Sequence, residues 1–271
     1  MSSTHIVEAV ADLLRHADHV AVLTGAGISA ESGIPTFRDA LSGLWAQFDP
    51  DEVATPSAFE RRPELVWDWY AERRLRILEA APNPGHHALV EIERRVPRFT
   101  LVTQNIDGLH AAAGSRAVIE LHGNIRRVKC WREGTVFEVW QEGDVRPPPC
   151  PGCGAWLRPD VVWFGELLPE AGLRAAWDAA ESCDLFLSIG TSNLVEPAAS
   201  LPWMAHDAGA AVVVINPSDE GQRRGRGIHF LPGRAGDVLP ALVAKAWHDE
   251  PSAFPPFRRE RGRGAGPPSS N

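Results

Sequence analysis

Three groups of residues in this sequence could do chemistry. The first is the pair Gly25 and Gly27, because residues without a side chain let a phosphate group approach the main chain. The second is His122, because an imidazole with an unperturbed pKa near neutrality can accept and return a proton. The third is the set of 4 cysteines, which in a chain of 271 residues do not form a disulfide scaffold and indicate metal binding or simple burial.

The glycines stand in the pattern Gly25-x-Gly27-x-x-Ala30, directly after the apolar run of residues 19–24. A strand followed by such a turn is typical of a dinucleotide site, where free N–H groups hold the pyrophosphate; the alternative is an ordinary tight turn. A dehydrogenase would continue with a short strand that ends in an acidic residue about 20 residues later. This chain continues with a polar, glycine-punctuated loop over residues 31–39, which argues against hydride transfer.

These residues must be positioned by elements that alternate along the chain. Apolar spacing predicts helices over residues 5–17, 63–80, 87–95, 170–182 and 238–247, and strands over 19–24, 99–103, 118–121, 184–189 and 211–215. Residues 130–153 combine cysteines with a triple proline, so we expect an irregular insert. Alternating strands and helices predict an α/β fold with a parallel sheet, whose ligand lies at the carboxyl ends of the strands.

Composition narrows the class of ligand. The formal net charge of −8 argues against DNA or RNA as the ligand and is compatible with a lysine-rich protein segment. No apolar run is long enough to cross a bilayer, and residues 1–14 lack the pattern of a signal peptide. We therefore expect a cytoplasmic protein that does not act at a membrane, with a disordered tail over residues 251–271.

Longer blocks of sequence identify a family. In chain order they are GAGISAESGIPTFRD (25–39), TQNIDGLH (103–110), LHGN (121–124), CPGCG (150–154), VVWFGE (161–166), GTS (190–192) and INP (215–217). With these blocks the chain resembles the sirtuins, the NAD-dependent protein-lysine deacylases, and in particular their bacterial class III type. The resemblance implies a Rossmann-like parallel sheet with helices on both faces, formed by residues 1–36, 86–124 and 166–250. It also implies a smaller inserted module with helical and zinc-ribbon-like parts, formed by residues 37–85 and 125–165.

The resemblance implies that NAD is bound and consumed as a co-substrate. The loop from Gly25 through Arg38 would wrap the pyrophosphate and the nicotinamide ribose, and Asp107 would accept a hydrogen bond from the carboxamide. The full set of residues expected to bind NAD is Gly25, Ala26, Gly27, Ser29, Ala30, Thr36, Phe37, Arg38, Trp45, Gln104, Asn105, Ile106, Asp107, Gly190, Thr191, Ser192, Asn216, Pro217, Ser218 and Ala235.

The resemblance also makes His122 the general base. The acyl oxygen of an acyl-lysine protein or peptide would attack the carbon that loses nicotinamide, and His122 would take a proton from a ribose hydroxyl. The products would be free lysine, nicotinamide and an O-acyl-ADP-ribose. Taken alone, His122 and Asp107 would be a structural histidine and a turn or cap aspartate, but the surrounding blocks favour the catalytic interpretation.

The acyl group is indicated by Tyr70 and Arg73, which share one face of the expected helix 63–80. Sirtuins that remove succinyl or malonyl groups carry a similar pair, and a buried acidic group needs a guanidinium and a hydroxyl to replace its water. The alternative is a core tyrosine beside a solvated arginine. We expect deacetylation together with desuccinylation or demalonylation. The residues expected to line the substrate tunnel and pair with the peptide backbone are Val162, Phe164 and Gly165; the alternative there is a buried strand.

Sirtuins generally hold one structural zinc ion between two Cys-x-x-Cys pairs, and this chain departs from that pattern. Cys150 and Cys153 form the second pair, but Glu133 stands where the second cysteine after Cys130 would be. Because structural zinc prefers sulfur and nitrogen ligands, either Glu133 completes the site, or another group does, or no metal binds. Cys183 precedes an expected strand and is interpreted as a small core residue.

Two other activities compete with deacylation. A mono-ADP-ribosyltransferase would use the same NAD site, but His122 and the block around Phe164 favour deacylation. A non-catalytic NAD-sensing or zinc-mediated binding module is disfavoured by the complete set of polar pocket residues. The sequence predicts no oligomeric state.

Overall fold

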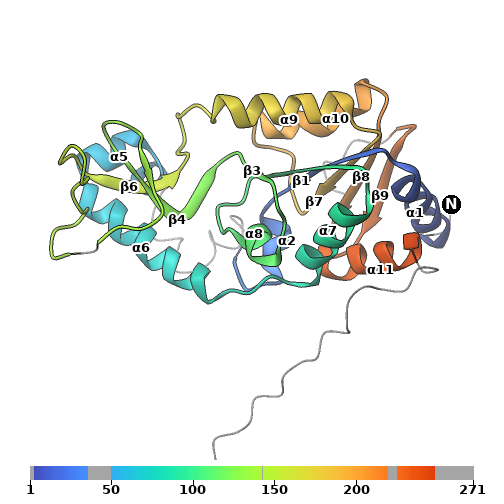
Figure 1. Cartoon of the computed structure of the whole chain (residues 1–271), viewed down its shortest axis with the longest axis horizontal. Helices are drawn as coiled ribbons and strands as arrows, with labels where there is room; N and C mark the ends of the chain where they lie inside the picture. Colours follow the sequence, from blue (N-terminus) through green and yellow to red (C-terminus); the bar gives the residue numbers. More distant parts are fainter. Residues whose placement is uncertain (1–2, 36–49, 142, 219–224, 248–271) are drawn as a thin grey trace, which may run out of the picture.

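The computed structural model describes residues 3–35, 50–141, 143–218 and 225–247 of the chain (Figure 1). Thr36, Phe37, Arg38 and Trp45, which we expect to bind NAD, lie outside the described residues, as does the tail expected to be disordered. The described residues form two sheets, one with six strands and one with three. Within the same residues, no helix has the length and apolar character needed to span a membrane.

The larger sheet has the strand order β3-β2-β1-β7-β8-β9, and every neighbouring pair in it is parallel. Its strands are β1 (His19–Thr24), β2 (Arg98–Thr103), β3 (Val118–Glu120), β7 (Leu185–Ile189), β8 (Ala211–Asn216) and β9 (Ile228–Pro232). The chain runs outward from β1 to β3 and then returns to β7 on the other side of β1. Ligands of such sheets bind outside the carboxyl ends of the strands where the order reverses, here between β1 and β7. The expected parallel α/β sheet is confirmed.

Helices cover both faces of this sheet (Figure 1). On one face lie α1 (Ser3–His16), α7 (Pro84–Arg95) and α11 (Ala235–Trp247), and on the other α9 (Glu170–Ser182) and α10 (Leu201–Asp207). Strand β1 contributes to both cores, because Val20 and Val22 pack on the first face and Ala21 and Leu23 on the second. All residues of β1 are therefore buried, as expected for a central strand of a parallel sheet.

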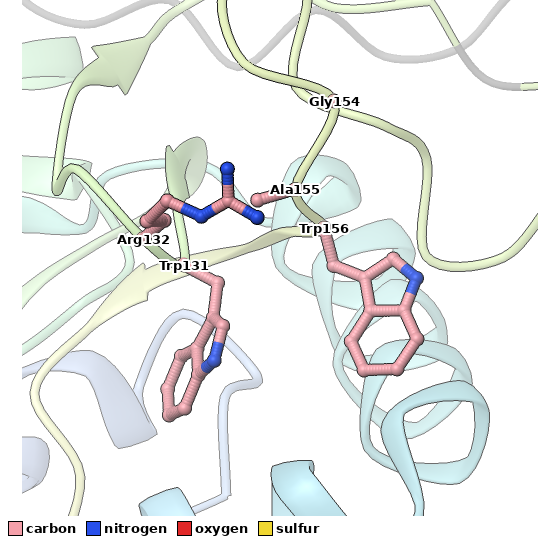
Figure 2. A pocket seen from close by; sticks show the side chains of 5 residues that line it. All are labelled: Trp131, Arg132, Gly154, Ala155 and Trp156. Atoms are coloured by element: carbon pink, nitrogen blue, oxygen red, sulfur yellow. The ribbon is translucent and has the colours of Figure 1, made fainter.

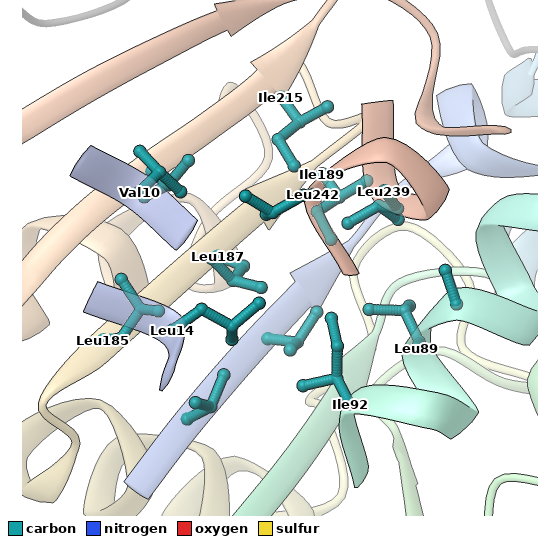
Figure 3. Packing of buried hydrophobic residues seen from close by; sticks show 14 of the residues in the cluster. Val10, Leu14, Leu89, Ile92, Leu185, Leu187, Ile189, Ile215, Leu239 and Leu242 are labelled. Atoms are coloured by element: carbon teal, nitrogen blue, oxygen red, sulfur yellow. The ribbon is translucent and has the colours of Figure 1, made fainter. Parts of the chain in front are cut away.

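Branched aliphatic side chains fill the core on the first face. Figure 3 shows Leu187 and Ile189 of β7 near Leu14 of α1, Leu89 of α7 and Leu239 of α11, and all five are fully buried. Burying one such side chain is worth about 1.5–3 kcal/mol, so this packing holds the central strands firmly. The loops that follow β1 and β7 consequently start from fixed positions.

The smaller sheet is antiparallel, with the order β5-β4-β6. Its strands are β4 (Gly123–Cys130), β5 (Val136–Phe137) and β6 (Leu157–Val161), and the helices near it are α4 (Pro50–Val53), α5 (Pro56–Arg61) and α6 (Pro63–Glu79). Phe59 of α5 and Tyr70 of α6 pack in one cluster with Ile125 of β4 and with Trp163. In Figure 1 this group lies at the opposite end of the molecule from α1 and α11. The domain boundaries expected from the sequence stay a prediction.

Four strands, β4, β5, β6 and β9, were not predicted from the sequence. The pairing of β4 with β6 shifts register between Asn124 and Val128, and this irregularity interrupts the alternation of apolar and polar residues. Strand β9 is the edge of the larger sheet, and only Leu231 in it is fully buried. A weakly buried edge strand lacks the continuous apolar run that reveals the central strands.

Candidate functional site

The glycine turn lies where the sheet order reverses, between β1 and the short helix α2 (Ala26–Ala30). The N–H groups of Gly25 and Gly27 donate to the carbonyl oxygens of Ile189 and Gly190, at 3.0 and 2.8 Å. A Cβ atom at Gly27 would lie 2.7 Å from the Cα atom of Gly190, which is main chain and cannot move aside. Close approach of the β1 and β7 loops therefore requires glycine here. The expectation of free N–H groups for a pyrophosphate is wrong for these two, since both are already bonded.

Side chains from two segments meet behind this turn. The amide of Asn105 donates to the Gly25 carbonyl oxygen and to Ser29 Oγ, each at 3.1 Å. Ser29 Oγ in turn donates to Asp107 Oδ2 at 2.7 Å. The other carboxylate oxygen, Oδ1, accepts the backbone N–H of Leu109 at 2.8 Å. The structure thus brings together Ser29, Asn105 and Asp107, three residues that the sequence placed in one pocket.

The carboxylate of Asp107 is 4% exposed. Burial raises its pKa, while the hydrogen bonds from Leu109 and Ser29 and the charges of Arg126 and Arg73 lower it. Arg126, which sequence reasoning missed, also donates from Nε to the Asp107 carbonyl oxygen at 2.8 Å. Each carboxylate oxygen has two lone pairs, so Asp107 can accept a further hydrogen bond from a ligand N–H.

His122 follows β3 and is partly buried. Its Nδ1 lies 2.9 Å from the carbonyl oxygen of Gln104, which can only accept, so Nδ1 carries the proton and Nε2 is left as an acceptor. Burial lowers the pKa of His122 and the bond to Gln104 raises it, with burial the larger effect. The ring is therefore neutral at pH 7 and can act as a base through Nε2.

The residue after His122 must be glycine. Gly123 has a φ of 79°, and a Cβ atom there would overlap the carbonyl oxygen of Asp160 on β6. The carbonyl oxygen of His122 itself accepts the N–H of Val162 at 2.9 Å. Position 122 is thus held between the larger sheet and the smaller one, and these contacts explain in physical terms why glycine follows His122.

Side chains also join the ends of β2, β7 and β8. Gln104 Nε2 donates to Thr191 Oγ1 and Asn216 Nδ2 donates to the Thr191 carbonyl oxygen, both at 3.0 Å. Gln104, Thr191 and Asn216 therefore lie together at one edge of the sheet, as expected. Of the other residues expected to bind NAD, Ala26 and Ile106 are partly buried, and Ala30, Ser192, Pro217 and Ser218 are exposed.

The start of α11 is tied to the glycine segment. Gly236 donates its N–H to Glu31 Oε1 at 2.9 Å, a contact that sequence reasoning missed because Glu31 lies more than two hundred residues away in the chain. Ala235 is buried, and its main chain lies against Gly85 at the start of α7. Ala235 therefore offers little side-chain surface, and its place near the adenine stays a prediction.

Tyr70 and Arg73 of α6 share one environment. Tyr70 is 3% exposed and its hydroxyl accepts from Trp163 Nε1 at 3.0 Å, so its own proton can be donated to another acceptor. Burial raises the pKa of Tyr70 to about 12, which keeps the hydroxyl protonated. The guanidinium of Arg73 lies 5.4 Å from the ring centre of Trp69. Burial lowers the pKa of Arg73, while Tyr70 and Asp107 raise it. The positive charge of Arg73 in turn lowers the pKa of Tyr70 and that of Asp107.

The block around Phe164 is only partly available to a peptide. The N–H groups of Val162 and Phe164 donate to the carbonyl oxygens of His122 and Ala54, at 2.9 and 3.0 Å. Phe164 is 53% exposed, and Gly165 after it is also exposed and has a φ of 86°. The alternative of an ordinary buried strand does not describe Phe164 and Gly165. Pairing of this segment with a peptide backbone stays a prediction.

Three thiols gather at the smaller sheet. The sulfur atoms of Cys130, Cys150 and Cys153 lie within 4.8 Å of one another, and no other such group of ligands occurs in the described part of the chain. Glu133 donates its N–H to Cys130 Sγ at 3.4 Å, but its carboxylate does not belong to the group and the residue is exposed. Three thiolates supply three of the four ligands of a structural zinc site. Cys183 is buried in the core under α9, as expected.

A hollow of about 400 Å³ lies at the turns that carry these thiols. Figure 2 shows its lining by Trp131, Arg132, Gly154, Ala155 and Trp156. None of these residues belongs to the expected NAD set, and all of them lie next to the smaller sheet. The hollow is therefore separate from the region after β2 and β3 of the larger sheet where Asn105, Asp107 and His122 lie.

Comparison with known proteins agrees with this geometry. A model of the Sir2 family matches residues 25–197. NAD-dependent protein deacylase 1 of Pseudomonas aeruginosa is 50% identical over 249 residues, which is 89% of this chain and 99% of that protein. The NAD-dependent protein deacylase of Ralstonia nicotianae is 51% identical over 229 residues, which is 84% of this chain and 92% of that protein.

Solved structures show the same fold. A Sir2 homologue in complex with NAD has a TM-score of 0.81 and 43% identity, covering 88% of this chain and 93% of that one. A Sir2 protein bound to a myristoylated histone peptide has a TM-score of 0.69 and 33% identity, covering 90% of this chain and 97% of that one. The chain therefore spans nearly the whole length of these relatives.

Proposed function

Because the chain belongs to the Sir2 family, we propose that it is an NAD-dependent protein-lysine deacylase that transfers the acyl group to ADP-ribose and releases nicotinamide. The observation that carries this proposal is the state of His122, a neutral imidazole with an acceptor nitrogen. Its partner Gln104 directly precedes Asn105 in the cluster with Ser29 and Asp107. A proton acceptor is thereby fixed beside polar groups that fit a nicotinamide riboside.

We place NAD at the carboxyl ends of the strands of the larger sheet, where the strand order reverses between β1 and β7. Asp107, buried and able to accept a further hydrogen bond, fits the carboxamide of nicotinamide. The exposed loops after β7 and β8 fit the phosphates and the adenosine ribose. The proposed NAD residues are those expected from the sequence, including Thr36, Phe37, Arg38 and Trp45, which lie outside the described residues.

NAD supplies the carbon that accepts the acyl oxygen and the nicotinamide that leaves. The chain's own contribution is positioning and proton transfer. His122 Nε2 accepts the proton of a ribose hydroxyl, and the Gln104 carbonyl keeps the ring in the tautomer that makes this possible. The same carbonyl stabilises the imidazolium that forms, because its bond to Nδ1–H strengthens when the ring is charged.

Tyr70 and Arg73 support a preference for acidic acyl groups. Arg73 offers a guanidinium that can bind a carboxylate through two parallel hydrogen bonds, and Tyr70 offers a hydroxyl proton. Tyr70 is buried against Trp163 and Arg73 is partly buried beside Trp69, so a carboxylate placed here would lose part of its water and needs charged partners. We propose succinyl- or malonyl-lysine as substrates beside acetyl-lysine.

We propose that Cys130, Cys150 and Cys153 hold one structural zinc ion. The clustering of three sulfurs and the N–H of Glu133 directed at Cys130 Sγ fit such a site. The metal would stabilise the turns of the smaller sheet and take no part in the reaction, because the base is His122. The fourth ligand would be a water molecule or the Glu133 carboxylate, which would first have to move towards the three sulfur atoms.

One assay tests the proposed function. The purified protein is incubated with NAD and either no peptide, an acetyl-lysine peptide or a succinyl-lysine peptide, and nicotinamide release is measured. We expect release only with an acylated peptide, together with an O-acyl-ADP-ribose product. Equal release without peptide would indicate an NAD hydrolase or ADP-ribosyltransferase, and no release under any condition would indicate an NAD-binding module.

A further inference from the structure

Two buried histidines lie outside the roles proposed so far. His86 on α7 is 0% exposed, and His110 on the short helix α8 (Leu109–Ala113) is 2% exposed. Their ring centres are 4.9 Å apart and the ring planes are inclined at 55°. Each ring has one nitrogen that is buried and has no hydrogen-bond partner among the described residues: Nε2 of His86 and Nδ1 of His110. Buried polar atoms without partners are rare, so both require an explanation.

The protonation of His86 follows from its cap contact. The backbone N–H of Asn83 donates to His86 Nδ1 at 3.3 Å, in the reciprocal arrangement of a capping box at the start of α7. Nδ1 is therefore an acceptor without a proton, and a neutral His86 must carry its proton on Nε2. Since Nε2 is the orphan atom, His86 presents a buried donor that has no acceptor.

The protonation of His110 follows from two threonines. Its Nε2 lies 2.9 Å from Thr24 Oγ1, and the Thr24 hydroxyl donates its only proton to Thr103 Oγ1 at 2.8 Å. Thr24 can therefore only accept from His110, which places the His110 proton on Nε2. The orphan Nδ1 is then a bare acceptor that has no donor.

The two orphan atoms are complementary. Burial lowers the pKa of His86 to about 4 and that of His110 to about 3. The neighbouring His87 lowers the pKa of His86 further, and His86 lowers the pKa of His110 further. Both rings are therefore neutral at pH 7. A single water molecule can accept from the first ring and donate to the second, which meets the minimum of two partners for a buried water. Leaving both atoms unpaired would cost stability on each side.

We propose that one buried water joins His86 Nε2 to His110 Nδ1, and that through this link the two histidines position Asn105. The route is short: Thr103 Oγ1, which accepts from Thr24, also accepts the backbone N–H of Asn105 at 3.0 Å. The inference rests on the proposed function, because Asn105 belongs to the proposed NAD site.

Both ends of the link are connected to helix α2, the His86 end through Asn83 and the His110 end through Asn105. Asn83 Nδ2 donates to the Ile28 carbonyl oxygen at 2.7 Å, and the Asn105 amide donates to Ser29 Oγ at 3.1 Å. Ile28 and Ser29 are adjacent residues of α2, which follows the glycine turn. The link thus connects two asparagines that hold α2, and its loss should loosen the nicotinamide end of the pocket without touching the peptide side.

The first test uses the wild-type protein and no activity measurement. Imidazole ¹⁵N–¹H correlation spectra near pH 7 should show both His86 and His110 neutral and protonated on Nε2. A high-resolution crystal structure should show one water within hydrogen-bond distance of His86 Nε2 and His110 Nδ1. A proton on His110 Nδ1, or an empty gap between the rings, overturns the proposal. Because these readouts need no turnover, they stand even if the protein proves inactive as a deacylase.

The second test separates positioning from folding. In His86→Glu the carboxylate keeps the capping box, since glutamate is a usual residue at this helix position, but an ionised carboxylate has no N–H to replace that of Nε2 and the link is lost. We expect a melting temperature close to wild type, an unchanged KM for the acyl peptide, and about a tenfold rise in the KM for NAD and in the inhibition constant of nicotinamide. His87→Glu, at the exposed neighbouring position, is the matched control and should change none of these. Unchanged NAD and nicotinamide constants, or an equal rise for NAD and peptide, overturns the proposed role.

Discussion

Replacing Arg73 should separate the removal of acidic acyl groups from deacetylation. In Arg73→Met the side chain keeps its approximate length and its contact with Trp69 but loses the guanidinium that we propose binds the acyl carboxylate. Acetyl-lysine has no such carboxylate. The substitution should therefore reduce desuccinylation strongly and leave deacetylation nearly intact.

The expected size follows from the surroundings of Arg73. Removing one partner of a buried, hydrogen-bonded charge pair costs about 2–5 kcal/mol. Arg73 is only partly buried, so we take the lower part of this range, about 2–3 kcal/mol, or about a 30- to 150-fold loss in kcat/KM for a succinyl peptide. The Tyr70 hydroxyl would remain as a neutral donor, which limits the loss.

A second variant controls for the effect of the Arg73 charge on Asp107. That charge lowers the pKa of Asp107, so its loss could weaken NAD binding for any acyl substrate. Arg73→Lys keeps the charge but not the two parallel hydrogen bonds, and should have a normal KM for NAD with an intermediate loss of desuccinylation. Steady-state kinetics with acetyl and succinyl peptides of one sequence measures both effects. If Arg73→Met lowers kcat/KM equally for both peptides, the carboxylate interpretation is wrong.

Three further outcomes follow from the site. Gly27→Ala should lower the free energy of unfolding by about 1–3 kcal/mol, because the new methyl group meets the main chain of Gly190; urea unfolding measures this, and unchanged stability would contradict the contact. His122→Ala should lower product formation by about 10²–10⁴-fold while nicotinamide exchange persists. Wild-type kcat should fall as pH drops through the His122 pKa, which lies below 6.5 because burial disfavours the charged ring. A kcat that shows no fall anywhere in the acid range in which the protein stays folded would argue against this base. Metal analysis should find one zinc per chain and almost none in Cys130→Ser, and Glu133→Cys should slow zinc loss to a chelator; equal zinc in wild type and Cys130→Ser would refute the site.

Much of the fold can be read from local patterns in the sequence. Strand β1 is predicted because both of its faces are covered, so its apolar run is continuous and ends abruptly at Gly25. The same holds for β7, which ends at Gly190. Strand β4 is missed because a register shift after Asn124 breaks its alternation, and β9 because an edge strand is only partly buried. Local patterns reveal an element only where its burial is regular.

The candidate site divides in the same way. The resemblance to the sirtuins, carried by blocks of sequence along the chain, suffices to nominate Asn105, Asp107 and His122, although the residue types taken alone would not. They do not show that the N–H of Gly27 is bonded to Gly190, nor that Glu133 lies outside the thiol group. These facts depend on segments that are distant in the sequence.

The sequence by itself determined the parallel α/β fold, the family resemblance and the candidate base at His122, because apolar periodicity and motif order are properties of the chain alone. Tertiary structure decided which nitrogen of His122 carries the proton, through the carbonyl of Gln104. It also decided that His86 and His110 face each other with one unpaired nitrogen each. The physical reason is that a hydrogen bond needs two atoms about 3 Å apart, and only the packed chain brings such partners together.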